Sequence, residues 1–408
     1  MSGPSSSETS SSGVVGSSSE TSSVGASSEA VGSSLETSSV GASSGMGGEA
    51  TDPQRPTLVL GYPRLLAREL ARAAMDDGQH VIVLVEPRER ERAQTELAGA
   101  ELLEGAATSL DLGLSGVEYN QLCERVRIVH HVPPRGRELR KKIVASTREL
   151  LELVHAARHL QIAVHHSSVQ VFGERTGWIE EDTPIETATL NNAKEAALAL
   201  AERMVTRAWG ELPLCIARAG FSAGHAETGE TETDSGIYLL SLIGLATGAD
   251  LRLPFPGRGE WQLNLVPIDW VAAMSVRLAR EPSAPRSAFH FVDPSPFSVR
   301  KVLELVLGAA ARESRQGQGG GRFLPAGLTR ALLRAPGLEP LVRSPREFLE
   351  AWLRDVRFSS LKTNALLMDA PLCPAFDEYV SRIVAHVAES ARQGMIREPE
   401  AVEDALLG

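Results

Sequence analysis

A serine and a lysine in the segment 165–202 carry groups that could take part in a reaction. Ser168 lies near the end of an apolar run that starts at Ile162, and the β-branched residues of this run predict a strand that closes at Gly173. Lys194 lies at the start of a stretch rich in alanine and leucine, which predicts a helix. A lysine ammonium held beside a serine hydroxyl could polarise a carbonyl group.

The same segment resembles the catalytic segment of the extended short-chain dehydrogenases/reductases. In that family a Ser-Ser-x-x-Val-x-Gly strand end supplies a catalytic serine, and Ser168 stands at its position. The following helix of the family carries Tyr-x-x-x-Lys and then Ala-Glu, which is matched here by Ala201 and Glu202. Counting back from this pair places Lys194 at the tyrosine position and Leu198 at the lysine position. The resemblance therefore implies the family's scaffold without its catalytic pair.

The resemblance also implies what each missing group did. The phenol donates a proton to the carbonyl oxygen as hydride arrives, and the lysine lowers the pKa of the phenol and holds the nicotinamide ribose. Losing a positioned general acid lowers the rate by roughly 10²–10⁴. No Tyr-x-x-x-Lys occurs elsewhere in the chain, whose four tyrosines are Tyr62, Tyr119, Tyr238 and Tyr379. We expect the family's chemistry to be lost, unless Lys194 replaces the phenol.

The ordered part of the chain is expected to begin, near residue 56, with the pattern of a dinucleotide-binding fold. Thr57–Leu60 reads as a short buried strand, Gly61 follows it, and a helical pattern continues to Gly78. A second apolar run, residues 80–85, ends at Glu86. A strand, a glycine, a helix, a strand and an acid within about thirty residues are typical of the first unit of a Rossmann-like sheet.

The turn after the first strand departs from the family's Gly-x-x-Gly-x-x-Gly, because it contains Gly61, Tyr62, Arg64 and Ala67. We take Gly61, Tyr62 and Arg64 as the candidate cofactor contacts of this turn. Arg64 replaces the glycine that lets the backbone approach the pyrophosphate. Its side chain either blocks the site or points outward and pairs with phosphate, and we favour blocked or weakened binding.

Charged residues after the second strand bear on the choice between NAD and NADP. Glu86 could accept hydrogen bonds from the adenosine ribose, which favours NAD. Arg88 and Arg90 could instead hold the 2′-phosphate of NADP. A solvated charge cluster without a ligand is the third interpretation, so the choice stays open.

A closer resemblance, to carboxyl-terminal thioester reductases and fatty acyl-CoA reductases, rests on an Asp-Leu-Gly-Leu phrase at 111–114. The adenine-contacting aspartate of that family, which follows the glycine matched by Gly105, is replaced by Ala106. The small residues that flank the cofactor after His131 are replaced by two prolines, which fix φ and remove a backbone donor. A polar, acidic stretch, residues 220–235, stands where the family closes over its substrate.

Composition excludes several classes of protein. The net charge of −11 argues against a general nucleic-acid or anionic-membrane surface. No uncharged apolar run approaches the ~20 residues that span a bilayer. Three cysteines without a CxxC predict free thiols in a reducing cytoplasm. His155 and His159 lie one helical turn apart without an acidic partner, so we expect no metal site.

These patterns predict an α/β fold with a doubly wound parallel sheet and a smaller, mostly helical C-terminal region. The expected parts are a disordered Ser/Gly-rich tail (1–52), a Rossmann-like domain (53–300), a helical region (301–395) and an acidic tail (396–408). The expected function is binding of an unknown small molecule or protein, with affinity for NAD or NADP weakened or lost. The alternative is an active NAD(P)H-dependent reductase of acyl thioesters or aldehydes with relocated catalytic groups.

Overall fold

A computed structural model describes residues 56–185, 188–190, 192–233, 235–247, 260–316 and 354–393 of the 408-residue chain. All of these residues belong to one unit, Glu49–Gly408. The tails predicted at 1–52 and at 396–408 lie entirely outside the described residues.

In the described part of the chain, seven parallel strands form the central sheet. Short apolar runs such as VIVLV in β2 suit strands buried on both faces. The strand order is β10-β7-β5-β4-β1-β2-β3, and every neighbouring pair is parallel. The predicted Rossmann-like, doubly wound sheet is therefore confirmed. The strands are β1 (Thr57–Leu60), β2 (Val81–Val85), β3 (Glu101–Glu104), β4 (Ile128–His131), β5 (Ile162–Ser168), β7 (Leu214–Ala219) and β10 (Ala288–Phe291).

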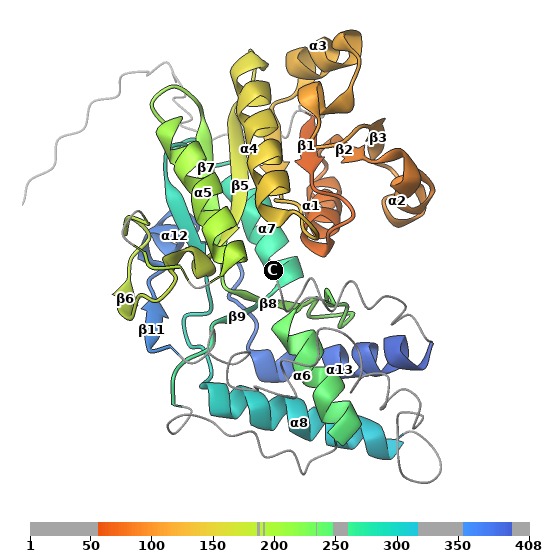
Figure 1. Ribbon diagram of the computed structural model, residues 1–408, viewed down its shortest axis with the longest axis vertical. Coiled ribbons are helices and arrows are strands. Elements are labelled where there is room, and N and C mark those ends of the chain that lie inside the picture. The colour runs from red at the N-terminus through yellow and green to blue at the C-terminus, as the bar shows by residue number, and fades with distance from the viewer. Residues whose placement is uncertain are drawn as a thin grey trace, which may run out of the picture. The chain divides into compact units, whose positions relative to one another are not determined.

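Helices cover both faces of this sheet (Figure 1). Helices α1 and α7 pack against one another and share a core with Val59 and Val83. Helices α3, α4 and α5 cover the other face, to which the alternate residues Leu58 and Ile82 point. The strand order reverses between β1 and β4, where the carboxyl ends of the strands leave a crevice for ligands. The helices are α1 (Leu65–Asp76), α2 (Arg90–Glu96), α3 (Gly116–Arg125), α4 (Leu139–Ala156), α5 (Ala193–Arg207) and α7 (Ile268–Leu278).

The end of β5 differs from the prediction. The strand stops at Ser168, and Val169–Phe172 forms a 3-10 turn instead of continuing the strand to Gly173. The Ser168 hydroxyl accepts a hydrogen bond from the backbone N–H of Gln170, at 3.3 Å, and this local bond turns the chain out of the sheet. Gly173 then has a φ of +55°, which ends the turn.

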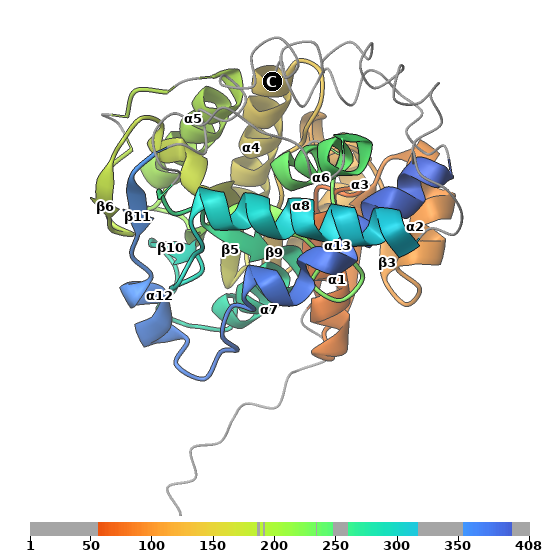
Figure 2. The same cartoon turned by 90° about the horizontal axis from the view of Figure 1, so that it is seen from below.

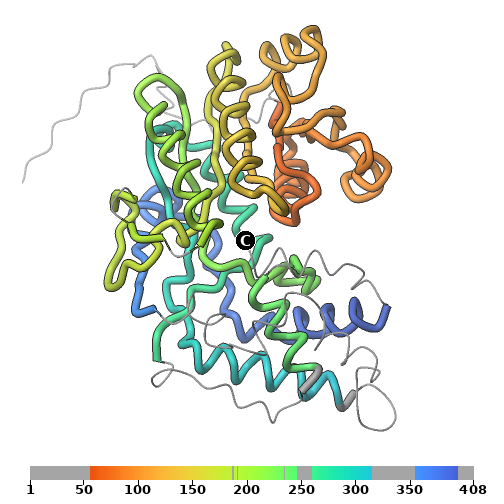
Figure 3. The backbone as a smooth tube through the Cα atoms, in the orientation of Figure 1, coloured from red at the N-terminus to blue at the C-terminus, as the bar shows by residue number. Residues whose placement is uncertain are grey.

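The C-terminal region is helical, as predicted. Helices α6 (Gly236–Thr247), α8 (Val299–Gln316) and α13 (Phe376–Arg392) pack on one another around a shared apolar core (Figures 2 and 3). The short strand β11 (Val356–Phe358) pairs with β6 (Gly177–Ile179), and β8 (Phe221–Gly224) pairs with β9 (Leu265–Pro267). Helix α6 comes from the segment before residue 300, so the helical core contains residues from both sides of that position. The domain boundaries 53–300 and 301–395 stay a prediction.

A buried carboxylate fastens α12 (Leu361–Leu366) to the rest of the fold. Glu181 is 4% exposed and accepts hydrogen bonds from the backbone N–H groups of His290, Lys362 and Thr363, at 3.0, 2.6 and 3.0 Å. The Thr363 hydroxyl donates a further bond to the same carboxylate. One side chain thus satisfies four donors from β10 and the start of α12.

Candidate ligand-binding site

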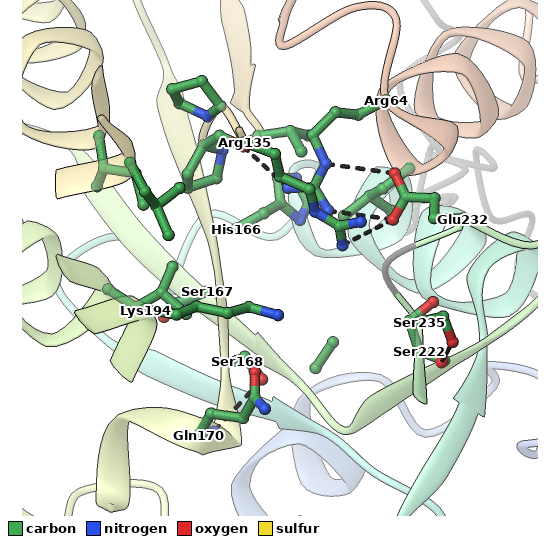
Figure 4. Close-up of a pocket in the computed structure, with 18 of the residues that line it drawn as sticks. Arg64, Arg135, His166, Ser167, Ser168, Gln170, Lys194, Ser222, Glu232 and Ser235 are labelled. Carbon is green, nitrogen blue, oxygen red and sulfur yellow. Dashed lines mark hydrogen bonds and ion pairs between the residues drawn. The ribbon is translucent and has the colours of Figure 1, made fainter. Parts of the chain in front are cut away.

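A cleft of about 1800 Å³ lies at the carboxyl ends of the central strands. Its lining includes the start of α1, the 132–148 segment that leads from β4 into α4, and the start of α5. Residues 230–233, which follow β8, also line the cleft. Ser168, Lys194 and Arg64 all line this cleft, so the structure brings together three of the residues singled out in the sequence (Figure 4).

The lining of the cleft is strongly basic although the chain as a whole carries a net charge of −11. Ten arginine and lysine side chains face three glutamates in the lining. A cleft lined mostly by one sign of charge concentrates ligands of the opposite sign. The cationic side chains are Arg64, Arg68, Arg92, Arg135, Arg137, Arg140, Lys141, Arg148, Lys194 and Arg354, and the acidic ones are Glu138, Glu230 and Glu232.

The carboxylate of Glu232 lies at the N terminus of α1. It accepts a hydrogen bond from the backbone N–H of Leu65, the first residue of the helix, at 3.1 Å. The Arg64 guanidinium donates to both carboxylate oxygens at 3.3 Å, and Arg135 forms an ion pair with the carboxylate at 2.7 Å (Figure 4). Arg64 also donates to the carbonyl oxygen of Pro133 at 2.9 Å. Neither Glu232 nor Arg135 was predicted as a site residue from the sequence. The acidic composition of residues 220–235 was the only indication of Glu232.

Electrostatics keep Glu232 ionised. Burial by itself would raise the pKa of this carboxyl, but the guanidinium groups of Arg135 and Arg64 outweigh burial and hold the pKa at about 2. The hydrogen bond from Leu65 acts in the same direction. A full negative charge therefore stays at the N terminus of α1, where the helix dipole favours an anion.

Ser168 and Lys194 lie on the other side of the cleft. Lys194 is the second residue of α5, whose N-cap Asn192 accepts a hydrogen bond from the backbone N–H of Glu195 at 2.8 Å. Figure 4 shows the Lys194 side chain extending into the cleft beside Ser167 and Ser168. Leu198, one turn further along α5, also lines the cleft. An ammonium and a hydroxyl at this place can bind an oxygen atom of a ligand.

None of the four tyrosines, all of which lie within the described residues, lines the cleft. Tyr62 instead donates a hydrogen bond to Glu96 at 2.8 Å, and Tyr238 and Tyr379 are buried in the helical core. Burial raises the pKa of Tyr62, and the bond to Glu96 adds to this shift. The cleft thus contains no phenol that could donate a proton.

Three other candidate cofactor residues also lie outside the cleft lining. Gly61 has a φ of +120°, and a Cβ atom there would lie 2.4 Å from the carbonyl oxygen of Val132. Close packing of β1 against the chain after β4 therefore requires this glycine. Glu86 and Arg88 form an ion pair with one another at 2.9 Å, and both are exposed.

Two histidine pairs connect β4 and β5 behind the cleft. Nδ1 of His131 and Nδ1 of His165 lie 2.9 Å apart, and Nδ1 of His130 lies 3.2 Å from Nε2 of His166. All four rings are buried, and His166 lines the cleft. Burial lowers the pKa of His130 to about 3 and that of His165 to about 4, and it lowers the pKa of the other two as well. The rings are therefore neutral at pH 7.

The described ranges contain no candidate metal site and no candidate membrane-spanning helix. No group of three or more His, Cys, Asp or Glu side chains there could hold a metal ion. Among the helices described, none has both the length and the apolar character needed to cross a membrane.

Residues 66–275, about half of the chain, match the sequence model of the male sterility protein family of NAD-binding domains. The chain belongs to this family. A curated relative, the glycine betaine reductase ATRR of Emericella nidulans, is 26% identical over 218 residues, which are 50% of this chain. The match covers only 16% of that reductase.

Solved structures with the same fold include two reductase domains. The terminal R domain from the myxalamid PKS-NRPS biosynthetic pathway has a TM-score of 0.64 at 22% identity, over 86% of this chain and 94% of that one. The aureusimine biosynthetic cluster reductase domain has a TM-score of 0.60 at 14% identity, over 84% and 92%. A dTDP-glucose 4,6-dehydratase of Bacillus anthracis str. Ames, in complex with NAD, has a TM-score of 0.58 at 13% identity, over 83% and 98%. The predicted resemblance to extended short-chain dehydrogenases and thioester reductases is confirmed.

In this male sterility-type protein the residues at the N terminus of α1 do not fit a bound dinucleotide. A dinucleotide fold places the pyrophosphate at the N terminus of the first helix, on its backbone N–H groups. Here the Leu65 N–H and the guanidinium groups of Arg64 and Arg135 are bonded to the Glu232 carboxylate. The Glu232 carboxylate therefore lies where the pyrophosphate of a cofactor is expected.

Proposed function

We propose that this protein is a binding member of its NAD-binding family, which holds an anionic small molecule or an anionic segment of a protein and does not carry out hydride transfer. The observation that carries the proposal is the composition of α5 at the cleft, where Lys194 and Leu198 stand in place of a phenol and its lysine. The basic lining supports an anionic ligand. Affinity for NAD or NADP is weak or lost, because Glu232 competes for the same donors.

Turnover and binding assays on the full chain test this proposal. Purified protein is mixed with NADH or NADPH and with an acyl thioester or an aldehyde, and oxidation of the nicotinamide is followed by its absorbance. We expect no oxidation above a reaction without protein. Micromolar binding of NADPH, together with turnover that disappears in Lys194→Ala, would overturn the proposal.

A second candidate function is reduction of an acyl thioester or aldehyde with relocated groups. The observation in its favour is that Ser168 and Lys194 line the same cleft, where an ammonium could polarise a carbonyl. The relatives named as reductases agree with it. This candidate predicts tight cofactor binding by the wild type and loss of turnover, with retained binding, in Lys194→Ala.

A further inference from the structure

We propose that Glu232 is a specificity-determining residue, which excludes diphosphate groups from the cleft by acting as the resident anion at the N terminus of α1. The inference deepens the proposed function, on which it rests, because it names the residue that sets which anions the cleft accepts. Arg64, identified in the sequence as the obstacle, is on this view one of the groups that hold Glu232 in place.

The bonds of Glu232 are those that a diphosphate would need. Its carboxylate accepts bonds from the Leu65 backbone N–H, from Nε and Nη2 of Arg64, and pairs with Arg135. Bonds between ionised groups are about twice as strong as those between neutral groups. A ligand must therefore displace an ionised carboxylate from two guanidinium groups before its phosphates can reach the helix.

The loop that carries Glu232 is fastened to α1 at two further points. Glu230 forms an ion pair with Arg68, and Nε2 of His225 lies 3.5 Å from the Glu69 carboxylate. At the far side of the loop, the Arg382 guanidinium donates to the carbonyl oxygen of Ala226 at 2.9 Å. These contacts hold Glu232 near its site, and a group tethered in this way has an effective concentration on the order of millimolar or higher.

Isothermal titration calorimetry on the full chain tests the inference with inorganic pyrophosphate, NADH and NADPH as probes. Glu232→Gln and Glu232→Ala should bind each probe at least about tenfold more tightly than the wild type, because the competing anion has been removed. Glu227→Gln makes the same change of charge at an exposed position of the same loop and should leave the affinities unchanged. Adding Arg135→Ala to Glu232→Gln should remove most of the gain, which would assign it to this site.

Equal affinities in the wild type and both Glu232 variants would overturn the inference. So would a gain in Arg64→Gly with no gain in either Glu232 variant, because the obstacle would then be the arginine side chain. Glu232→Asp, which keeps the charge but shortens the side chain by one methylene, should give an intermediate affinity and serves if the other variants do not fold. Turnover by the wild type would overturn the proposed function instead, and it is measured separately from these affinities.

Discussion

The Arg218 guanidinium and the Glu202 carboxylate form an ion pair, with 2.8 Å between Nη2 and Oε2, in a place almost without solvent. Arg218 is 3% exposed and Glu202 is fully buried. Arg218 lies on β7 and Glu202 lies on α5, so the pair fastens α5 to the sheet and thereby positions Lys194 at the cleft. Glu202 matches the glutamate that follows the family's catalytic pair, and its contact explains how the framework persists although the pair itself is replaced.

Breaking this ion pair should strongly destabilise the fold. Glu202→Gln and Arg218→Met each leave one buried charge without its partner, and each should lower the free energy of unfolding by about 3–5 kcal/mol. The double variant Glu202→Gln/Arg218→Met should lose less than the sum of the single losses. Urea denaturation measures all of these values. Arg207→Met, at an exposed position of α5, is the control, and a loss in it equal to that of Arg218→Met would contradict the prediction.

Removal of the Glu181 carboxylate should also destabilise the protein. Glu181→Ala leaves the buried N–H and hydroxyl of Thr363 without the carboxylate that accepts from both, and each such group costs about 1–3 kcal/mol. We expect a decrease in the free energy of unfolding of at least about 2 kcal/mol in chemical denaturation. Asp182→Ala is a matched control, because its exposed ion pair with Lys362 contributes only about 0–1 kcal/mol. Similar losses in the two variants would count against the assigned role of Glu181.

The buried histidine pairs predict that stability falls below about pH 6.5, the ordinary pKa of histidine. The unfolded chain takes up protons in this range, whereas burial lowers the folded pKa of His165 to about 4 and that of His130 to about 3. The unfolded state then binds more protons, so the free energy of unfolding decreases as pH falls from 6.5 towards 4. Each ring that stays neutral contributes up to about 1.4 kcal/mol per pH unit. Urea denaturation between about pH 7.5 and about pH 5.5, one unit either side of that pKa, measures the slope.

Substitutions distinguish the contribution of the buried histidines from that of the exposed ones. His131→Leu/His165→Leu removes one buried pair and should flatten the profile, whereas the exposed His155→Gln should leave it unchanged. His225 acts in the opposite direction, because its hydrogen bond with Glu69 raises its pKa. A profile that is flat in the wild type between these pH values would contradict the prediction.

Restoring hydride transfer should require changes at both ends of the cleft. Lys194→Tyr with Leu198→Lys restores the proton donor and the group that lowers its pKa, and neither change alone restores both. Glu232→Gln removes the anion that competes with the cofactor. We expect NADPH oxidation with an aldehyde substrate only in the triple variant, with Ser168→Ala added to it as the inactive control. Equal activity in the triple variant and in the wild type would contradict this expectation.

The sheet could be predicted from the sequence because several of its strands contain a short apolar run, such as TLVL in β1 and VIVLV in β2. The end of β5 could not, because Val169, Val171 and Phe172 are apolar residues of types favoured in strands and are buried in a 3-10 turn. A single hydrogen bond, from the Gln170 N–H to the Ser168 hydroxyl, is part of what distinguishes the 3-10 turn from a continued strand. Apolar periodicity does not contain that information.

The cleft was predicted in part for a similar reason. Arg64 and Ser168 lie close in sequence to the carboxyl ends of β1 and β5, and Lys194 lies at the start of α5; the topology brings these places together. Glu232 meets Leu65 across 167 positions of the chain, and the composition of residues 220–235 does not say which carboxylate reaches α1. Tyr62 was expected to contact a cofactor but bonds to Glu96 on α2. Long-range side-chain contacts of this kind depend on the packing of helices that local patterns do not specify.

The anion at the start of α1 also has a consequence for the thermodynamics of folding. A protein that depends on a bound nucleotide to neutralise two arginines and a helix end gains stability as RT ln(1 + [L]/Kd), so its folded population follows the supply of that ligand. Glu232 is covalently part of the chain, and its contribution is therefore present at every nucleotide concentration. The carboxylate of Glu232 neutralises the two arginines and the helix end without a ligand, so this part of the stability does not depend on nucleotide concentration.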